Sequence, residues 1–151
     1  SELVSIPYNE IIQLLDDVCG IVIKPDKSII SALNQLKERG IRIVVLTVTD
    51  TAIAIYKIKH AGLSKYIDRV FSSTELFGGR KTGMVFSKIM EFLRNLGYAD
   101  SPGEVLVVGD DVDRDYRAPR EAGMHSILIS AESIPEIETI KNLGELINLL
   151  Q

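Results

Sequence analysis

The stretch VLVVGDDVDRD, residues 105–115, is the part of the sequence that most strongly indicates the fold. Four apolar residues followed by Gly109 are typical of a strand buried on both faces, as in a parallel sheet. Within the next six positions come four aspartates, Asp110, Asp111, Asp113 and Asp115. Like charges this close repel one another unless they are solvated, used as helix caps or bound to a cation. The pattern therefore predicts a buried strand that ends in an acidic cluster.

This acidic cluster has two interpretations. Oxygen ligands at a strand end suit Mg²⁺, which usually binds one or two carboxylates together with phosphate and water. Alternatively, Asp111 or Asp113 caps the helix that is expected to begin near Arg114 and complements its dipole. Capping needs one carboxylate and leaves the other three unexplained, so the pattern favours a cation site.

Length and composition favour a single domain that spans residues 1–151. Hydrophobic residues make up 46% of the sequence, enough for a substantial core. The net charge is -4 and the basic residues are scattered, which argues against nucleic acid as a partner. The single cysteine, Cys19, cannot form an internal disulfide and suits a reducing compartment. Without a signal peptide or an apolar run of about 18 residues, we expect a cytoplasmic protein with no membrane partner.

Apolar runs typical of strands alternate with helical periodicity along the chain. Besides the central run, the expected strands are residues 3–6, 21–23, 41–46, 70–73 and 126–130. The expected helices are residues 8–17, a helix capped by Asp26 or Ser28 that ends at Gly40, and residues 53–61, 84–96, 114–122 and 140–150. This alternation predicts an α/β fold with a parallel sheet wrapped by helices, which binds ligands at the carboxyl ends of its strands.

Two further signals fall at the same expected edge of the sheet. Thr47 ends a strand just before a helix, where its hydroxyl and the free backbone N–H groups at Val48 can bind an oxyanion, although Thr47 or Thr49 could simply cap that helix. The loop FGGRKTG, residues 77–83, carries Arg80 and Lys81 but lacks the spacing of a nucleotide-binding P-loop. A hydroxyl, a cation and metal-binding carboxylates together are the groups needed to hold a phosphoryl group.

Four ordered segments resemble the haloacid dehalogenase (HAD) superfamily, whose best-known members are Mg²⁺-dependent phosphatases. They are LKERGIRIVVLT (36–47), AGLSKYIDRVFSSTEL (61–76), GGRKTGMVFSKIM (78–90) and VLVVGDDVDRDYRAPREAGM (105–124). The resemblance covers residues 24–150. It implies a three-layer, Rossmann-like parallel sheet flanked by helices and a phosphatase-type activity with Mg²⁺ as cofactor.

The same resemblance implies roles for individual residues. Asp110 and Asp111 belong to the metal-binding motif, with Asp110 binding Mg²⁺ directly, while Asp115 would bind it through water or orient the lysine. Thr47 and Val48 would hold phosphate oxygens. In the third motif Lys81 is favoured as the cation that bridges phosphate and nucleophile, and counting back from Phe86 selects Arg80 instead. The implied substrate is a small phosphorylated metabolite.

One family motif is missing. The family's nucleophile is the first Asp of a DxDxT motif at the end of the first strand, and the second Asp is the general acid and base. The sequence contains no DxDxT. The nearest candidate is KPDKS, residues 24–28, with Lys24 in the nucleophile's place and Asp26 in that of the acid. This alignment predicts a catalytically impaired protein, a pseudoenzyme.

A second alignment makes residues 24–28 the linker that returns from a cap. Residues 8–17 would then be a remnant of that cap, and the true first strand would lie outside the sequence. A missing central strand would leave two rows of unpaired backbone groups, so residues 21–23, residues 3–6 or a second chain in an oligomer must fill its place. The competing functional class is a non-catalytic regulatory or scaffold domain of HAD-like or receiver-like fold.

Overall fold

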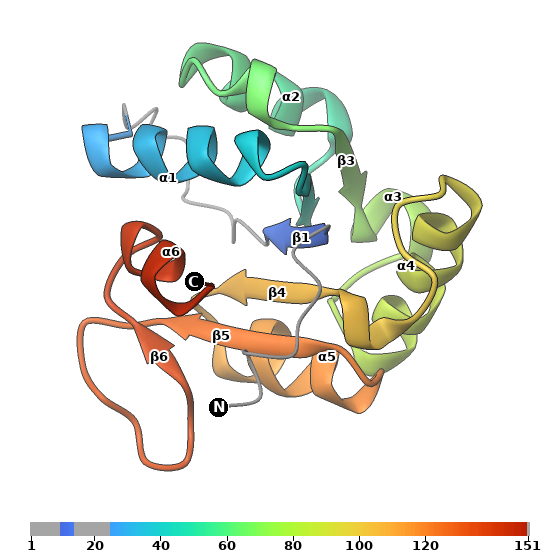
Figure 1. The fold of residues 1–151 in the computed structure, drawn as a ribbon. Coiled ribbons are helices and arrows are strands. Elements are labelled where there is room, and N and C mark those ends of the chain that lie inside the picture. Colours follow the sequence, from blue (N-terminus) through green and yellow to red (C-terminus); the bar gives the residue numbers. More distant parts are fainter. Residues whose placement is uncertain (1–9, 14–24, 151) are drawn as a thin grey trace.

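The structure is a computed structural model that describes residues 10–13 and 25–150. In these residues six strands form one sheet in the order β3-β2-β1-β4-β5-β6, and every neighbouring pair is parallel (Figure 1). The strands are β1 (Glu10–Gln13), β2 (Arg42–Thr47), β3 (Arg69–Ser72), β4 (Leu106–Gly109), β5 (His125–Ile129) and β6 (Thr139–Ile140). The α-helices are α1 (Lys27–Glu38), α2 (Thr51–His60), α3 (Ser73–Phe77), α4 (Gly83–Asn95), α5 (Ala118–Glu121) and α6 (Gly144–Leu149). The other helical segments are the 3-10 turns η2 (Ser64–Tyr66) and η3 (Pro102–Glu104) and the π-helical turn η4 (Val112–Arg117).

Helices cover both faces of the sheet and form two separate cores. On one face, α1 and α6 pack against side chains such as Ile43 and Leu106. On the other face, α4 and α5 pack against Val44 and Val107, which are the next residues along the same two strands. Successive side chains of a strand point to opposite faces, so these continuously apolar strands supply both cores. The predicted three-layer α/β architecture is confirmed.

The first strand corrects the prediction for the start of the chain. Residues 10–13 were expected within a helix, but they form β1, which pairs with β2 through Ile12 and Val44 and with β4 through Ile12 and Val107. An apolar run this short fits both the helical and the strand period. The strand conformation is favoured because it pairs the backbone N–H and C=O groups of β2 and β4 that face the gap between them. The central strand is therefore part of this sequence, and residues 10–13 are not part of a helical cap remnant.

Other expectations are confirmed or shifted at their ends. Asp26 caps α1, and Gly40 follows that helix with a φ of 77°. The expected closing helix begins later than predicted, because Ile140 belongs to β6 and α6 starts at Gly144. The helix expected over 114–122 is η4 followed by α5, with Pro119 in the first turn of α5, where its missing N–H is harmless. The expected strands at 3–6 and 21–23, and Cys19, lie outside the described residues.

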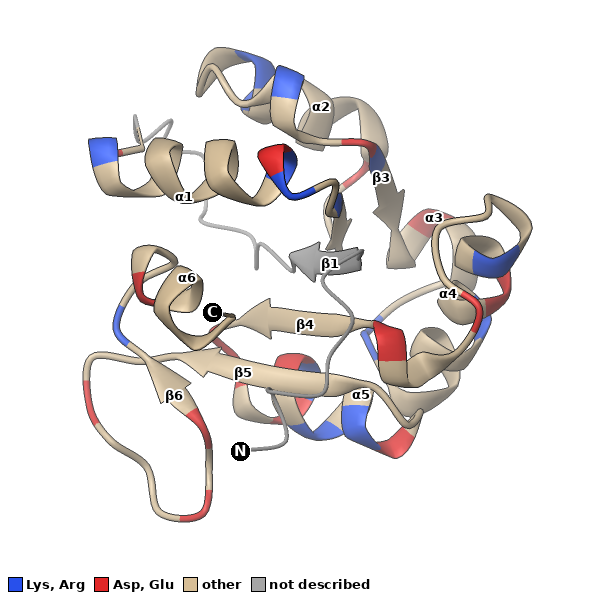
Figure 2. Ribbon diagram, in the orientation of Figure 1, with Lys and Arg blue, Asp and Glu red and all other residues tan. Residues whose placement is uncertain are grey.

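Charged residues are distributed over several elements. Figure 2 shows Lys and Arg on separate helices, among them α2, α4 and α5. Among the helices of residues 25–150, none is both long enough and apolar enough to cross a membrane.

We predict that Phe86→Ala destabilises the fold strongly, because this α4 side chain is fully buried in the second core. Truncating a buried Phe usually costs about 3–5 kcal/mol. Met84→Ala on the same helix is the control, since Met84 is 70% exposed and a change there should stay within about 0.5 kcal/mol. Urea unfolding of both variants measures the difference, and equal midpoints would contradict the assigned packing.

Candidate active site

The register of the central strands brings Thr47 and Asp110 to the same edge of the sheet. Gln13 of β1 pairs with Val45 of β2 and with Val108 of β4. Thr47 and Asp110 each stand two residues beyond these partners, Thr47 as the last residue of β2 and Asp110 directly after β4. Adjacent strands are about 4.8 Å apart, so the two backbones lie on the order of 10 Å from each other across β1. This spacing leaves room for a phosphoryl group between them.

A buried ion pair lies beside Asp110. Lys81 Nζ is 2.8 Å from Asp115 Oδ1, and both side chains are completely buried. The other carboxylate oxygen, Asp115 Oδ2, accepts hydrogen bonds from the backbone N–H groups of Asp110 at 3.1 Å and Asp111 at 3.0 Å. Burying two charges is costly unless they are paired and hydrogen-bonded. Here a single carboxylate fixes both Lys81 and the backbone that carries Asp110.

Gly109 makes room for this carboxylate. A Cβ at position 109 would lie only 2.6 Å from Asp115 Cβ and would overlap the carboxyl group itself. Such approaches are not tolerated in packed interiors, so a residue without a side chain is required where β4 meets Asp115. Packing therefore explains why a glycine precedes Asp110 in the sequence.

The structure distinguishes the two candidate cations geometrically. Arg80 is exposed, whereas Lys81 is 2% exposed and directed at Asp115. Thr82, the next residue, caps α4 by accepting a hydrogen bond from the N–H of Val85. The cap fixes the chain direction just after Lys81 and helps to bring its side chain under the acidic strand end.

The segment between β2 and α2 is held by a hydrogen bond to the side chain of Thr47. Thr47 is 4% exposed, and its Oγ1 accepts a hydrogen bond of 3.1 Å from the N–H of Thr49. A hydroxyl can still donate while it accepts, so the O–H of Thr47 can serve an oxyanion. Among the described residues, Thr49 Oγ1 is a buried oxygen for which no hydrogen-bond partner is found. Val48, between the two threonines, is half-buried.

The remaining aspartates are used differently from one another. Asp111 Oδ1 accepts from the N–H of Arg114 at 2.8 Å, and this hydrogen bond chiefly holds the pKa of Asp111 below its usual value. Asp113 forms an exposed pair with Arg117, and Asp110 is exposed at the end of β4. No group of three potential metal ligands occurs within residues 10–13 and 25–150. Asp110 is thus the described aspartate best placed for a cation, while Asp111 serves as a cap and Asp115 as an anchor for Lys81.

Asp26 is placed as a helix cap. Its Oδ1 accepts from Ser28 Oγ at 2.5 Å and from the N–H of Ile29 at 3.0 Å, and the Ser28 hydroxyl is the main reason for its lowered pKa. These contacts account for the carboxylate without a catalytic role. Lys24, its proposed neighbour in the degenerate motif, lies outside the described residues.

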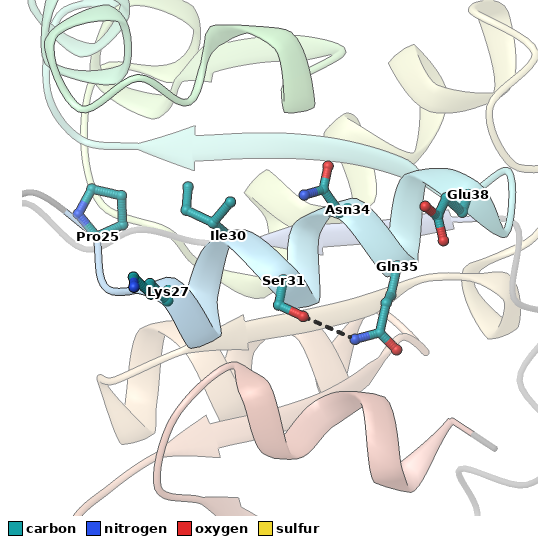
Figure 3. Close-up of a pocket in the computed structure, with 7 residues that line it drawn as sticks. All are labelled: Pro25, Lys27, Ile30, Ser31, Asn34, Gln35 and Glu38. Atoms are coloured by element: carbon teal, nitrogen blue, oxygen red, sulfur yellow. Dashed lines mark hydrogen bonds between the residues drawn. The ribbon is translucent and has the colours of Figure 1, made fainter.

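A depression of about 420 Å³ lies along α1 (Figure 3). Its lining includes Lys27, Asn34 and Glu38, and Gln35 donates a hydrogen bond of 3.2 Å to Ser31 within it. None of the candidate site residues lines this depression.

The short helix α3 was missed by the sequence analysis. Its signal was present, because SSTE at residues 72–75 has the spacing of a helix-capping sequence, S-x-x-E. Ser72 indeed caps α3 by accepting a hydrogen bond from the N–H of Glu75. The side chains of Ser73 and Thr74 reach the carbonyl oxygens of Thr47 and Val48, so α3 belongs to the site.

Fold and site together define a class of protein: a parallel α/β domain in which the carboxyl edge of the sheet carries a threonine, a buried lysine–aspartate pair and an exposed aspartate. A family model described as haloacid dehalogenase-like hydrolase matches residues 5–123. The chain therefore belongs to the haloacid dehalogenase-like hydrolases. The match begins well before residue 24, where the resemblance of the sequence motifs began, and it includes β1.

Several phosphatases are similar to this chain. The ribulose-1,5-bisphosphate 5-phosphatase of Halopiger xanaduensis is 29% identical over 133 residues, which cover 78% of this chain and 53% of the relative. The glyceraldehyde 3-phosphate phosphatase of Methanocaldococcus jannaschii is 28% identical over 137 residues, covering 86% and 58%. The chain thus spans little more than half the length of these relatives.

Solved structures share the fold. The HAD-family hydrolase YfnB of Bacillus subtilis, solved with magnesium bound, superposes with a TM-score of 0.70 at 18% identity and covers 83% of this chain and 55% of that one.

We predict that Lys81→Met destabilises the protein by about 3–5 kcal/mol, because it leaves the Asp115 carboxylate buried without its cation. Arg80→Met is the matched control and should change the free energy of unfolding by less than about 0.5 kcal/mol, since Arg80 is exposed. Urea denaturation of both variants provides the comparison. Similar losses in both would show that the burial of Lys81 is wrongly assigned.

A second prediction concerns Gly109→Ala. The added Cβ must push the Asp115 carboxylate away from Lys81 and from the N–H groups of Asp110 and Asp111. Overpacking of this kind usually costs about 1–3 kcal/mol. Gly79→Ala, where a Cβ would meet no atom within 4 Å, is the control. An unchanged melting temperature for Gly109→Ala would contradict the described packing.

Proposed function

We propose that this chain is the core domain of a Mg²⁺-dependent phosphohydrolase that acts on small phosphorylated metabolites. The observation that carries the proposal is the placement of Thr47, Lys81 and Asp110 at one edge of the sheet, with Lys81 and the Asp110 backbone fixed by Asp115. The similarity to a ribulose-1,5-bisphosphate phosphatase and to a glyceraldehyde 3-phosphate phosphatase supports small phosphorylated metabolites as the substrate class. Because the chain spans part of their length, substrate choice by the whole protein is also a proposal.

The described residues fit a magnesium ion of the kind that keeps most of its coordination for phosphate and water. Asp110 is an exposed carboxylate at a strand end, and one or two such carboxylates are enough for Mg²⁺. When bound, the ion would neutralise phosphoryl oxygens and polarise the phosphorus toward attack. Asp111 and Asp115 would keep the roles described above, as cap and anchor.

The other groups would bind the phosphoryl oxygens. The Thr47 hydroxyl can donate one hydrogen bond. The Lys81 ammonium carries three N–H donors, and one of them bonds Asp115 Oδ1. Donors fixed in advance stabilise developing negative charge without reorganisation. Thr47 and Lys81 would thus hold the transferring group while Asp115 keeps the lysine in place.

The position of β1 in the sheet points to a different candidate for the nucleophile. Counting two residues on from Gln13, as from Val45 to Thr47 and from Val108 to Asp110, gives position 15, and the next two residues of the sequence are Asp16 and Asp17. Both lie outside the described residues. We propose that one of them attacks phosphorus, breaking the P–O bond to the substrate's alcohol and forming an aspartyl-phosphate that water then hydrolyses, as expected for this family.

The same count predicts a weak second step. The general acid and base of the family stands two residues after the nucleophile, where this sequence has Val18 or Cys19 in place of aspartate. Without a carboxylate there, protonation of the leaving group and activation of water both lose assistance worth about 10²–10⁴-fold each. We therefore expect slow turnover. Impaired catalysis stays a prediction, now because the general acid and base is missing and not because the nucleophile is.

The test is Mg²⁺-dependent hydrolysis of an aryl phosphate, with aspartyl-phosphate trapped by acid quench. We expect slow hydrolysis that Asp110→Asn abolishes, and a trapped phosphoenzyme that either Asp16→Asn or Asp17→Asn removes. Asp113→Asn is the control, because Asp113 belongs to the same acidic segment but is exposed and paired with Arg117.

Binding without chemistry is the second candidate function, favoured by the missing DxDxT motif. Mg²⁺-dependent binding of inorganic phosphate with neither turnover nor phosphoenzyme would support this regulatory or scaffold role. Absence of both binding and turnover would refute both functions.

A further inference from the structure

The segment of residues 47–51, here called the Thr47 loop, is held by three consecutive side chains of α3. Ser73 Oγ donates to the carbonyl oxygen of Thr47 at 3.4 Å, and Thr74 Oγ1 donates to that of Val48 at 2.7 Å. Glu75 then bonds Thr51 at the other end of the loop. Both ends of the loop that carries the candidate oxyanion donors are therefore tied to one short helix.

Glu75 replaces the missing cap of α2. Asp50 stands at the N-cap position of α2 but makes no side-chain cap hydrogen bond. Instead, Glu75 Oε1 accepts from the N–H of Thr51 at 2.9 Å, and Oε2 accepts from Thr51 Oγ1 at 2.6 Å. The hydrogen bond from the Thr51 hydroxyl is the main reason that the pKa of Glu75 is lowered. A carboxylate from a separate helix thus fixes where α2 begins.

In a local capping box, the glutamate three residues after the cap bonds back to the N-terminal N–H of its own helix. Glu75 has this position relative to Ser72, yet both of its oxygens bond Thr51, 24 residues earlier in the chain. The interaction therefore links α3 to the Thr47 loop. It limits the movement of the backbone between Thr47 and Thr51, which includes the N–H of Val48.

We propose that Glu75 is a positioning residue for phosphate binding, acting through the Thr47 loop. This inference rests on the proposed function, because the loop matters only if it binds phosphate oxygens. Small displacements of binding groups can cost about 100-fold in activity. A loop released from α3 at Thr51 would present the Thr47 hydroxyl and the Val48 N–H less accurately.

The chain provides a matched control in Glu104. Glu104 Oε2 accepts from the N–H groups of Asp100 at 2.6 Å and Ser101 at 2.9 Å, so it also caps a short helix with two hydrogen bonds. It lies before β4, at the opposite end of that strand from Asp110. Glu75→Ala and Glu104→Ala remove comparable hydrogen bonds, but only the first touches the Thr47 loop.

The experiment measures binding of inorganic phosphate in the presence of Mg²⁺ by titration calorimetry, with kcat/KM for an aryl phosphate as a second readout. We expect Glu75→Ala to weaken phosphate binding about 10- to 100-fold. Glu75→Gln should stay within about threefold of the parent, because an amide can still accept from the Thr51 N–H and bond its hydroxyl. Glu104→Ala should match the parent.

Each outcome bears on one hypothesis. Unchanged binding in Glu75→Ala, equal losses in Glu75→Ala and Glu104→Ala, or a loss in Glu75→Gln as large as in Glu75→Ala would overturn the positioning role. If the parent chain itself binds no phosphate and turns over no aryl phosphate, the proposed function fails instead. Thermal melting of all variants confirms that they are folded at the temperature of measurement.

Discussion

The buried ion pair between Lys81 and Asp115 is the interaction on which the rest of the site depends. Asp115 comes from η4, the turn after β4, and Lys81 from the loop before α4, so the pair joins two segments that are 34 residues apart in the sequence. The second carboxylate oxygen of Asp115 accepts hydrogen bonds from two consecutive N–H groups, those of Asp110 and Asp111. A charge pair without solvent is stable only when such contacts satisfy it. One carboxylate therefore sets the geometry of the lysine and of the acidic strand end together.

The sheet supplies the second constraint. Because β1 lies between β2 and β4, the residues that follow these strands must emerge at one edge. The Thr47 loop leaves β2 there, and α3, which follows the neighbouring β3, reaches it with three side chains. Parallel order thus converts separate segments into a continuous rim that surrounds the position expected for a phosphoryl group.

Much of this arrangement was predictable from local patterns. The apolar run before Gly109 indicated a buried strand, and the spacing of Val85, Phe86 and Ile89 indicated the core face of α4; both are found. The helix predicted over residues 8–17 was wrong at residues 10–13, because four residues such as those of β1 satisfy helical and extended patterns equally. The strand conformation of β1 is selected by hydrogen bonds to β2 and β4, which are distant in sequence.

The sequence by itself determined the α/β class, the family resemblance and the identity of the candidate residues, since these follow from periodicity and motif spacing. Only the tertiary structure decided that Lys81 and not Arg80 is the buried cation and that Asp115 faces it. It also decided that the Glu75 side chain bonds Thr51 and not the backbone of its own helix. Adjacent residues in a loop look alike in sequence. Burial and pairing distinguish them, because the cost of an unpaired buried charge depends on partners brought together only by folding.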